Sequence, residues 1–184
     1  MSTKFILNGG TEKDHSNNPD FYKEILKDAS ENAKVLIVPF AKEPERIAPT
    51  TEREIGELNK YKWQEKLNFI IADEENFINQ VKLAEVIYFQ GGKSLKLLEA
   101  LKKFPPLGDL FQGKTIAGES AGANVLARFF YSPVANVVSE GLGVVSVKLI
   151  PHYKEEYKDI FKNIALDVDP LYLKEYEYKV FNKI

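Results

Sequence analysis

Short apolar runs alternate with amphipathic stretches over the first 130 residues, and this alternation predicts the fold class. Buried strands are expected at 4–8, 34–40, 67–72, 85–90 and 114–117. Between the runs, apolar residues recur at helical spacing, for example at Phe21, Ile25 and Ala29. Strands that alternate with helices are typical of right-handed βαβ units. We therefore expect an α/β fold, with a mostly parallel sheet covered by helices on both faces.

Residues that favour helix N-termini predict where the helices begin. The expected caps are Asn18, Thr51, Asp73 and Ser94. Proline at the position after Asn18 suits the first turn of a helix. The charged, proline-containing stretch 41–49 is interpreted as a loop, so the second helix should run from Thr51 to about residue 66. A further helix is expected from residue 123 to about 130.

Beyond residue 131 the periodicity changes. Apolar runs at 134–138 and 144–150 predict two strands, which are expected to form a hairpin or a sheet extension around 140–143. A helix is expected at 153–165. The tyrosine-rich stretch 171–184 shows some alternation, which favours terminal strands.

Composition places the chain among globular proteins and removes several classes of function. Its 184 residues suggest one domain spanning 1–184, and 44% are apolar while 28% are charged. A net charge of −2 gives no electrostatic reason to expect nucleic acid or an anionic membrane as partner. The absence of cysteine excludes disulfides, thiolate metal sites and cysteine nucleophiles. No apolar run resembles a signal peptide or a membrane span, so a cytoplasmic protein is expected.

The stretch Gly118-Glu119-Ser120-Ala121-Gly122 carries the strongest chemical signal. It follows an expected strand and precedes an expected helix, which is the context of a nucleophile elbow, G-x-S-x-G. Such a turn holds a serine hydroxyl at the carboxyl edge of a sheet, where ligands bind in α/β proteins. An ordinary tight turn can have the same composition. The catalytic interpretation of Ser120 therefore requires a base elsewhere in the chain.

Only two histidines could supply that base. His15 lies in a polar loop and is interpreted as a solvated residue, whereas His152 follows the expected strand 144–150. If that strand ran parallel to the elbow strand in one sheet, His152 would emerge at the same edge as Ser120. The residue that orients the histidine is left open. The acidic candidates are Glu140, Glu119, Glu155, Glu156 and Asp159, with Glu140 weakly preferred because two glycines follow it and it does not lie on a helix face.

A second glycine-rich turn, Gly91-Gly92-Lys93-Ser94, is expected beside the elbow. It lacks the first glycine of a phosphate-binding P-loop, because Ile87 stands at that position. We interpret it as an oxyanion hole formed by the backbone N–H groups of Gly92 and Ala121. Two distant histidines and no cysteine make a metal site improbable, and no cofactor is expected.

Together these motifs resemble the dipeptidase E and cyanophycinase family of serine peptidases. The resemblance rests on Phe89-Gln90-Gly91-Gly92-Lys93-Ser94, on Gly118-Glu119-Ser120-Ala121-Gly122-Ala123-Asn124, and on Gly141-Leu142-Gly143 followed by Pro151-His152-Tyr153. It implies a flavodoxin-like fold of the glutamine amidotransferase type. It also implies that Ser120 is the nucleophile, that His152 is the base and that the amides of Gly92 and Ala121 bind the oxyanion. An aspartate-selective pocket would need cations, and Lys93 and Arg128 are nearest in sequence.

The sequence therefore predicts a serine peptidase, a small exopeptidase similar to dipeptidase E that acts on short peptides. Two alternatives stay open at this point. One is an esterase or amidase that uses the same residues on a non-peptide substrate. The other is a non-catalytic binding or regulatory protein that kept the elbow. The oligomeric state does not follow from the sequence.

Overall fold

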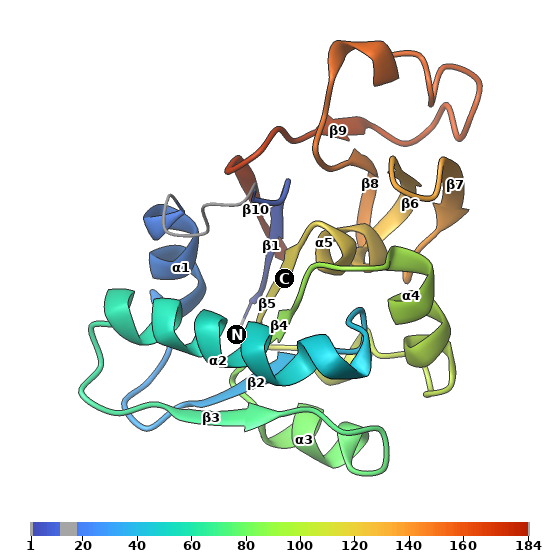
Figure 1. The fold of residues 1–184 in the computed structure, drawn as a ribbon. Helices are drawn as coiled ribbons and strands as arrows, with labels where there is room; N and C mark the ends of the chain where they lie inside the picture. The colour runs from blue at the N-terminus through green and yellow to red at the C-terminus, as the bar shows by residue number, and fades with distance from the viewer. Residues whose placement is uncertain (1, 12–17, 184) are drawn as a thin grey trace.

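A six-stranded sheet with helices on both faces forms the larger part of the computed structural model, which describes residues 2–11 and 18–183 (Figure 1). The strands of this sheet are β1 (Thr3–Asn8), β2 (Lys34–Val38), β3 (Asn68–Ile71), β4 (Val86–Phe89), β5 (Thr115–Glu119) and β10 (Tyr178–Lys183). They lie in the order β10-β1-β5-β4-β2-β3. β1 to β5 are parallel, and β10 pairs with β1 in the antiparallel sense. The predicted α/β fold with a mostly parallel sheet is confirmed.

The helices cover the sheet in two layers. They are α1 (Pro19–Leu26), α2 (Pro44–Tyr61), α3 (Phe77–Leu83), α4 (Ser94–Lys102) and α5 (Ala121–Leu126). Side chains of α1 and α2 pack on one face against Ile6, Ile37 and Ala117. Side chains of α3, α4 and α5 pack on the other face against Leu36 and Ile116. This alternation of inward side chains along each strand produces two apolar cores, one on each face of the sheet.

A smaller, four-stranded sheet follows α5, and Figure 1 shows it to the upper right of the first sheet. Its strands are β6 (Ala127–Ser132), β7 (Val137–Glu140), β8 (Val145–Ile150) and β9 (Pro170–Tyr172), in the order β7-β6-β8-β9. β8 runs parallel to both β6 and β9. The predicted hairpin of 134–138 with 144–150 is wrong, because β7 pairs antiparallel with β6 and β8 lies on the other side of β6.

Of two further predicted helices, the one after the elbow is present but shorter than expected, and the other does not form. The helix after the elbow ends at Leu126, because the residues from Ala127 onward pair with β8 as strand β6. The expected helix at 153–165 is a chain of turns with one short 3₁₀ helix at Glu155–Tyr157. Its Ala165 has a φ of 44°, which an α-helix does not contain. These turns carry the chain back so that β9 can pair in parallel with β8.

The second helix begins seven residues before the predicted cap. α2 starts at Pro44, so Thr51 lies inside it, and Pro49 is tolerated within its second turn. Proline at the first helical position loses no hydrogen bond, because that N–H has no partner within a helix. The expected cap Ser94 is itself the first residue of α4, and its Oγ accepts a hydrogen bond from Asn124 Nδ2 at 3.0 Å. Within the described ranges, no helix is long and apolar enough to span a bilayer.

Candidate active site

Ser120 lies in a strained turn between β5 and α5, at the carboxyl edge of the larger sheet. Its φ of 48° and ψ of −102° fall outside the common regions for a residue with a side chain. The turn is fixed because Ser120 N–H donates to Asn8 O at 3.0 Å and Asn124 N–H donates to Ser120 O at 2.9 Å. A Cβ on Gly118 would lie 2.4 Å from Gly122 C, so only glycine allows the helix to approach the strand so closely.

His152 contacts the serine, although its strand belongs to the second sheet. The Nε2 atom lies 2.8 Å from Ser120 Oγ, and the side chain is about one-third exposed. We expected this contact from a strand parallel to β5 in the same sheet. Instead, the backbone joins the sheets, because His152 N–H donates to Gly9 O at 2.8 Å. The imidazole packs on Gly10, where a Cβ would come within 2.2 Å of the ring.

Glu175 is the acidic residue that pairs with the histidine. Its Oε1 lies 2.6 Å from His152 Nδ1. Backbone hydrogen bonds hold its loop in place, since Tyr153 N–H donates to Leu173 O at 3.0 Å and Tyr176 N–H donates to Gly10 O at 2.8 Å. A proton on Nδ1 that is donated to the carboxylate leaves Nε2 as an acceptor for the serine hydroxyl. This tautomer is the one that a general base for Ser120 requires.

The preference for Glu140 as the orienting acid is therefore corrected. Glu140 is exposed and ends β7, where it pairs with Phe129 of β6. β7 is the edge strand of the second sheet, and the partner of His152 Nδ1 is Glu175. Of the other candidates, Glu155 and Glu156 are exposed, and Glu119 has different partners. His15 lies outside the described residues.

No local motif marks Glu175 in the sequence. We predicted terminal strands over 171–184 without placing a turn, and Glu175 lies in the turn between β9 and β10. Glu175 can be recognised as a partner of His152 only once β9 is known to run parallel to β8. The carboxyl ends of these two strands then lie side by side, and residues just beyond them, His152 and Glu175, meet.

The two expected oxyanion donors lie on either side of the serine. Ala121 is the next residue, and the Gly91–Gly92 turn approaches from β4, since a Cβ on Gly91 would lie 3.6 Å from Ser120 Cβ. Lys93 N–H donates to Ala41 O at 2.9 Å, which fixes this turn. In the described part of the chain, no acceptor pairs with the N–H of Gly92 or of Ala121. Both amides are thus available to a negative oxygen.

Lys93 and Arg128 already have acidic partners. Lys93 Nζ lies 2.7 Å from Glu43 Oε1, and the exposed Arg128 of β6 lies 3.2 Å, through its Nη1, from Asp167 Oδ2. Hydrogen bonds from Lys93 and Lys96 lower the pKa of the Glu43 carboxyl to about 2. The ion pair of Glu43 with Lys93 ties the turn after β2 to the Gly91–Gly92 turn.

A buried polar cluster lies behind the elbow, between the sheet and α2. Glu54 of α2 is 1% exposed, and Arg53 Nη2 lies 3.4 Å from its Oε1. Burial raises the pKa of the Glu54 carboxyl from an ordinary 4.5 to about 8, and the neighbouring Glu119 adds to the rise. Glu54 therefore keeps its proton at neutral pH in the folded protein.

We expect Glu54 to make stability depend on pH. Between about pH 5 and 8 the folded chain binds a proton that the unfolded chain has released, so the free energy of unfolding falls as pH rises. Relative to Glu54→Gln, the wild type should lose roughly 2 kcal/mol or more over this range, measured by urea unfolding. Glu52→Gln, an exposed change on the same helix, should follow the wild type. Parallel curves for the wild type and Glu54→Gln would contradict the assignment.

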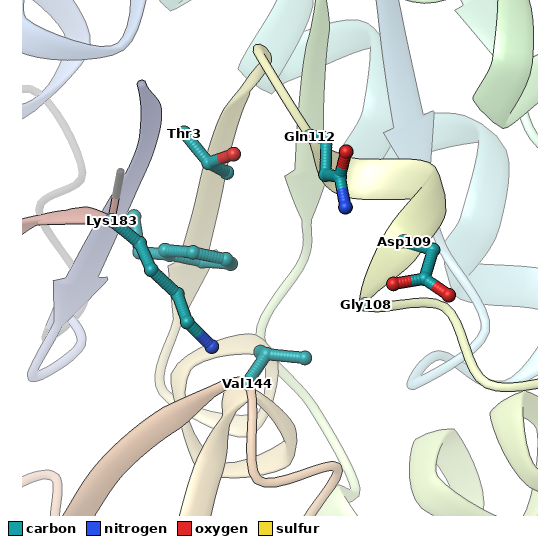
Figure 2. Close-up of a pocket in the computed structure, with 7 residues that line it drawn as sticks. Thr3, Gly108, Asp109, Gln112, Val144 and Lys183 are labelled. Atoms are coloured by element: carbon teal, nitrogen blue, oxygen red, sulfur yellow. The ribbon is translucent and has the colours of Figure 1, made fainter. Parts of the chain in front are cut away.

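A cavity of about 340 Å³ lies at the opposite edge of the sheet and is separate from this site (Figure 2). It is lined by Thr3, Phe5, Gly108, Asp109, Gln112, Val144 and Lys183. Thr3 begins β1, whereas Ser120 follows the end of β5. In the described ranges, no group of three or more His, Cys, Asp or Glu residues is placed to hold a metal ion.

Comparisons with known proteins agree with this architecture. A family model described as Peptidase family S51 matches residues 5–169. A solved structure of a protein assigned as a peptidase E in Listeria monocytogenes EGD-e is 18% identical, with a TM-score of 0.68 over 100% of this chain and 98% of that chain. A peptidase structure from an acI-B1 Actinobacterium is 23% identical, with a TM-score of 0.71 over 98% of this chain and 84% of that chain. At these identities, the structures support the fold alone. No curated protein matches the chain.

Proposed function

The chain belongs to peptidase family S51 and is a serine peptidase, and we propose that Ser120, His152 and Glu175 are its catalytic triad. We propose further that it is an exopeptidase that acts on short peptides, similar to dipeptidase E. One observation carries the assignment of the triad. A continuous line of contacts joins Ser120 Oγ to His152 Nε2 at 2.8 Å and His152 Nδ1 to Glu175 Oε1 at 2.6 Å.

Each residue of the triad has one task in this mechanism. Ser120 Oγ attacks the scissile carbonyl carbon while His152 Nε2 takes the hydroxyl proton. The carboxylate of Glu175 holds the required tautomer and stabilises the imidazolium that forms. The N–H groups of Gly92 and Ala121 donate to the negative oxygen of the tetrahedral intermediate. His152 then protonates the leaving amine, and water, deprotonated by His152, hydrolyses the acyl-enzyme.

The first test combines labelling with a substrate panel. We expect a serine-directed phosphonate to modify the folded protein once, on the peptide that contains Ser120, as measured by mass spectrometry. Denatured protein should stay unlabelled, because an isolated serine hydroxyl is a weak nucleophile. We also expect turnover of dipeptides from a panel that includes Asp-X. Folded protein that is neither labelled nor active would contradict the triad, and activity on esters alone would favour an esterase.

Family membership supports peptides as the substrate class, but it does not give the preferred residue or the cellular location. A peptidase of this family acts on peptides. The preferred N-terminal residue is a proposal for the panel to decide. Location in the cytoplasm and organisation as a single domain stay predictions from the sequence.

A further inference from the structure

Glu119, the residue before the nucleophile, is a buried carboxylate whose hydrogen-bond donors are neutral. It is 5% exposed, and its Oε2 and Oε1 accept hydrogen bonds from Tyr88 Oη at 2.7 Å and Thr11 Oγ1 at 2.8 Å. In the described part of the chain, no ion pair includes Glu119. A buried carboxylate without a counter-ion is costly, so a bound cation would offset its desolvation.

Three further buried polar atoms near Glu119 have no hydrogen-bond partner at normal distance and angle among the described residues. They are Glu54 Oε2, Gln90 Oε1 and Tyr22 Oη. Their side chains are at most 1% exposed. Burial raises the pKa of the Tyr22 hydroxyl, and Glu119 and Glu54 raise it further, which places the three groups in one electrostatic cluster. Native proteins rarely leave buried polar atoms unpaired, so this cluster has room for ordered water or a polar group of a ligand.

The cluster begins directly beside the reacting atoms. Gln90 follows β4, and Glu119 ends β5, so both side chains lie at the carboxyl edge next to Ser120. A Cβ on Gly91 would lie 3.6 Å from Ser120 Cβ and 3.8 Å from Glu119 Cδ. In a peptide cleaved after its first residue, the α-nitrogen is two bonds from the carbonyl carbon that Ser120 attacks. That nitrogen must therefore lie close to Ser120 during the attack, and Glu119 is the carboxylate next to Ser120 in the chain.

We propose that Glu119 binds the α-ammonium group of the substrate's N-terminal residue. The proposal rests on the assignment of Ser120 as nucleophile and adds the group that selects a free N-terminus. An ammonium has three donors and a positive charge, which suits a buried carboxylate whose hydrogen-bond donors, Tyr88 and Thr11, are neutral. A hydrogen bond from an ammonium to a carboxylate is stronger than one between neutral groups. Glu119 is thus a specificity residue that also helps to place the scissile carbonyl.

The nearby cationic side chains, Arg53 and Lys42, do not pair with the Glu119 carboxylate. Arg53 pairs with Glu54, and Lys42 is a half-buried ammonium whose pKa is lowered by burial. Within the described ranges, neither of them forms an ion pair with Glu119. Among the described residues, Glu119 therefore has no cationic donor.

The test compares a cleaved dipeptide with its N-acetylated form. In the wild type we expect acetylation to lower kcat/KM by about 100-fold, because the charged pair is lost. Glu119→Gln should lower kcat/KM for the free dipeptide by about 100-fold, and in this variant acetylation should cost about tenfold or less. Glu99→Gln, an exposed change on α4, should keep the wild-type ratio.

The outcomes separate this proposal from the triad. Wild type that is labelled at Ser120 but cleaves both peptides equally would overturn the role of Glu119 and leave the triad intact. Equal losses on both peptides in Glu119→Gln would reduce Glu119 to a support of the turn. Wild type that is neither labelled nor active would overturn both. If Glu119→Gln does not fold, inhibition of the wild type decides, because an amino-acid amide should inhibit far better than its N-acetyl form.

Discussion

Replacing Ser120 by alanine should lower peptidase turnover by about 10⁴-fold or more, because the attacking atom is removed. Alanine fits the same turn, since both residues carry a Cβ and the strained φ of 48° is kept. The folded state loses one partly buried hydrogen bond, to His152 Nε2. Stability should therefore change by about 1 kcal/mol or less. Steady-state kinetics on the best dipeptide and urea unfolding measure the two effects.

Ser146→Ala provides the matched control for this experiment. Ser146 is exposed in β8, six residues before His152, and the change removes the same hydroxyl far from the elbow. It should leave kcat/KM within about twofold of the wild type. If Ser120→Ala retained wild-type activity, another nucleophile would have to be sought.

The second large effect is expected at Glu175. Glu175→Gln should lower kcat by about 10² or more with little change in KM, because an amide neither fixes the Nδ1–H tautomer nor stabilises the imidazolium. The side chain is about 30% exposed and isosteric with glutamine, so the fold should tolerate the change. Rates measured over a range of pH values would show whether the loss persists where His152 is neutral.

Glu140→Gln is the control that separates the two assignments of the acid. Glu140 ends an edge strand, is exposed, and should contribute less than about a twofold change. A large loss in Glu140→Gln together with an active Glu175→Gln would restore the interpretation based on sequence. The opposite result is expected from the 2.6 Å contact between Glu175 and His152.

Apolar patterns in the sequence predicted the parallel strands correctly, because residues within each run favour a buried strand. Five apolar runs became the five parallel strands, because β-branched and aromatic residues pack well on a buried sheet. The start of α2 was missed because Pro44 and Pro49 were interpreted as loop residues, although proline near a helix N-terminus removes few hydrogen bonds. The segment after Leu126 was assigned to a helix, whereas pairing with β8 makes it a strand.

The sequence by itself determined the α/β class and singled out the turn at Ser120 and the residue His152, because hydrophobic periodicity, glycine spacing and the small number of histidines can all be recognised without a structure. Only the tertiary structure decided that β8 leaves the main sheet, that Gly9 O receives the His152 amide, and that Glu175 reaches the histidine. The physical reason is that β8 and β9 pair in parallel across a connection of 19 residues, 151–169. Such a pairing depends on packing between distant segments, which local propensity does not encode.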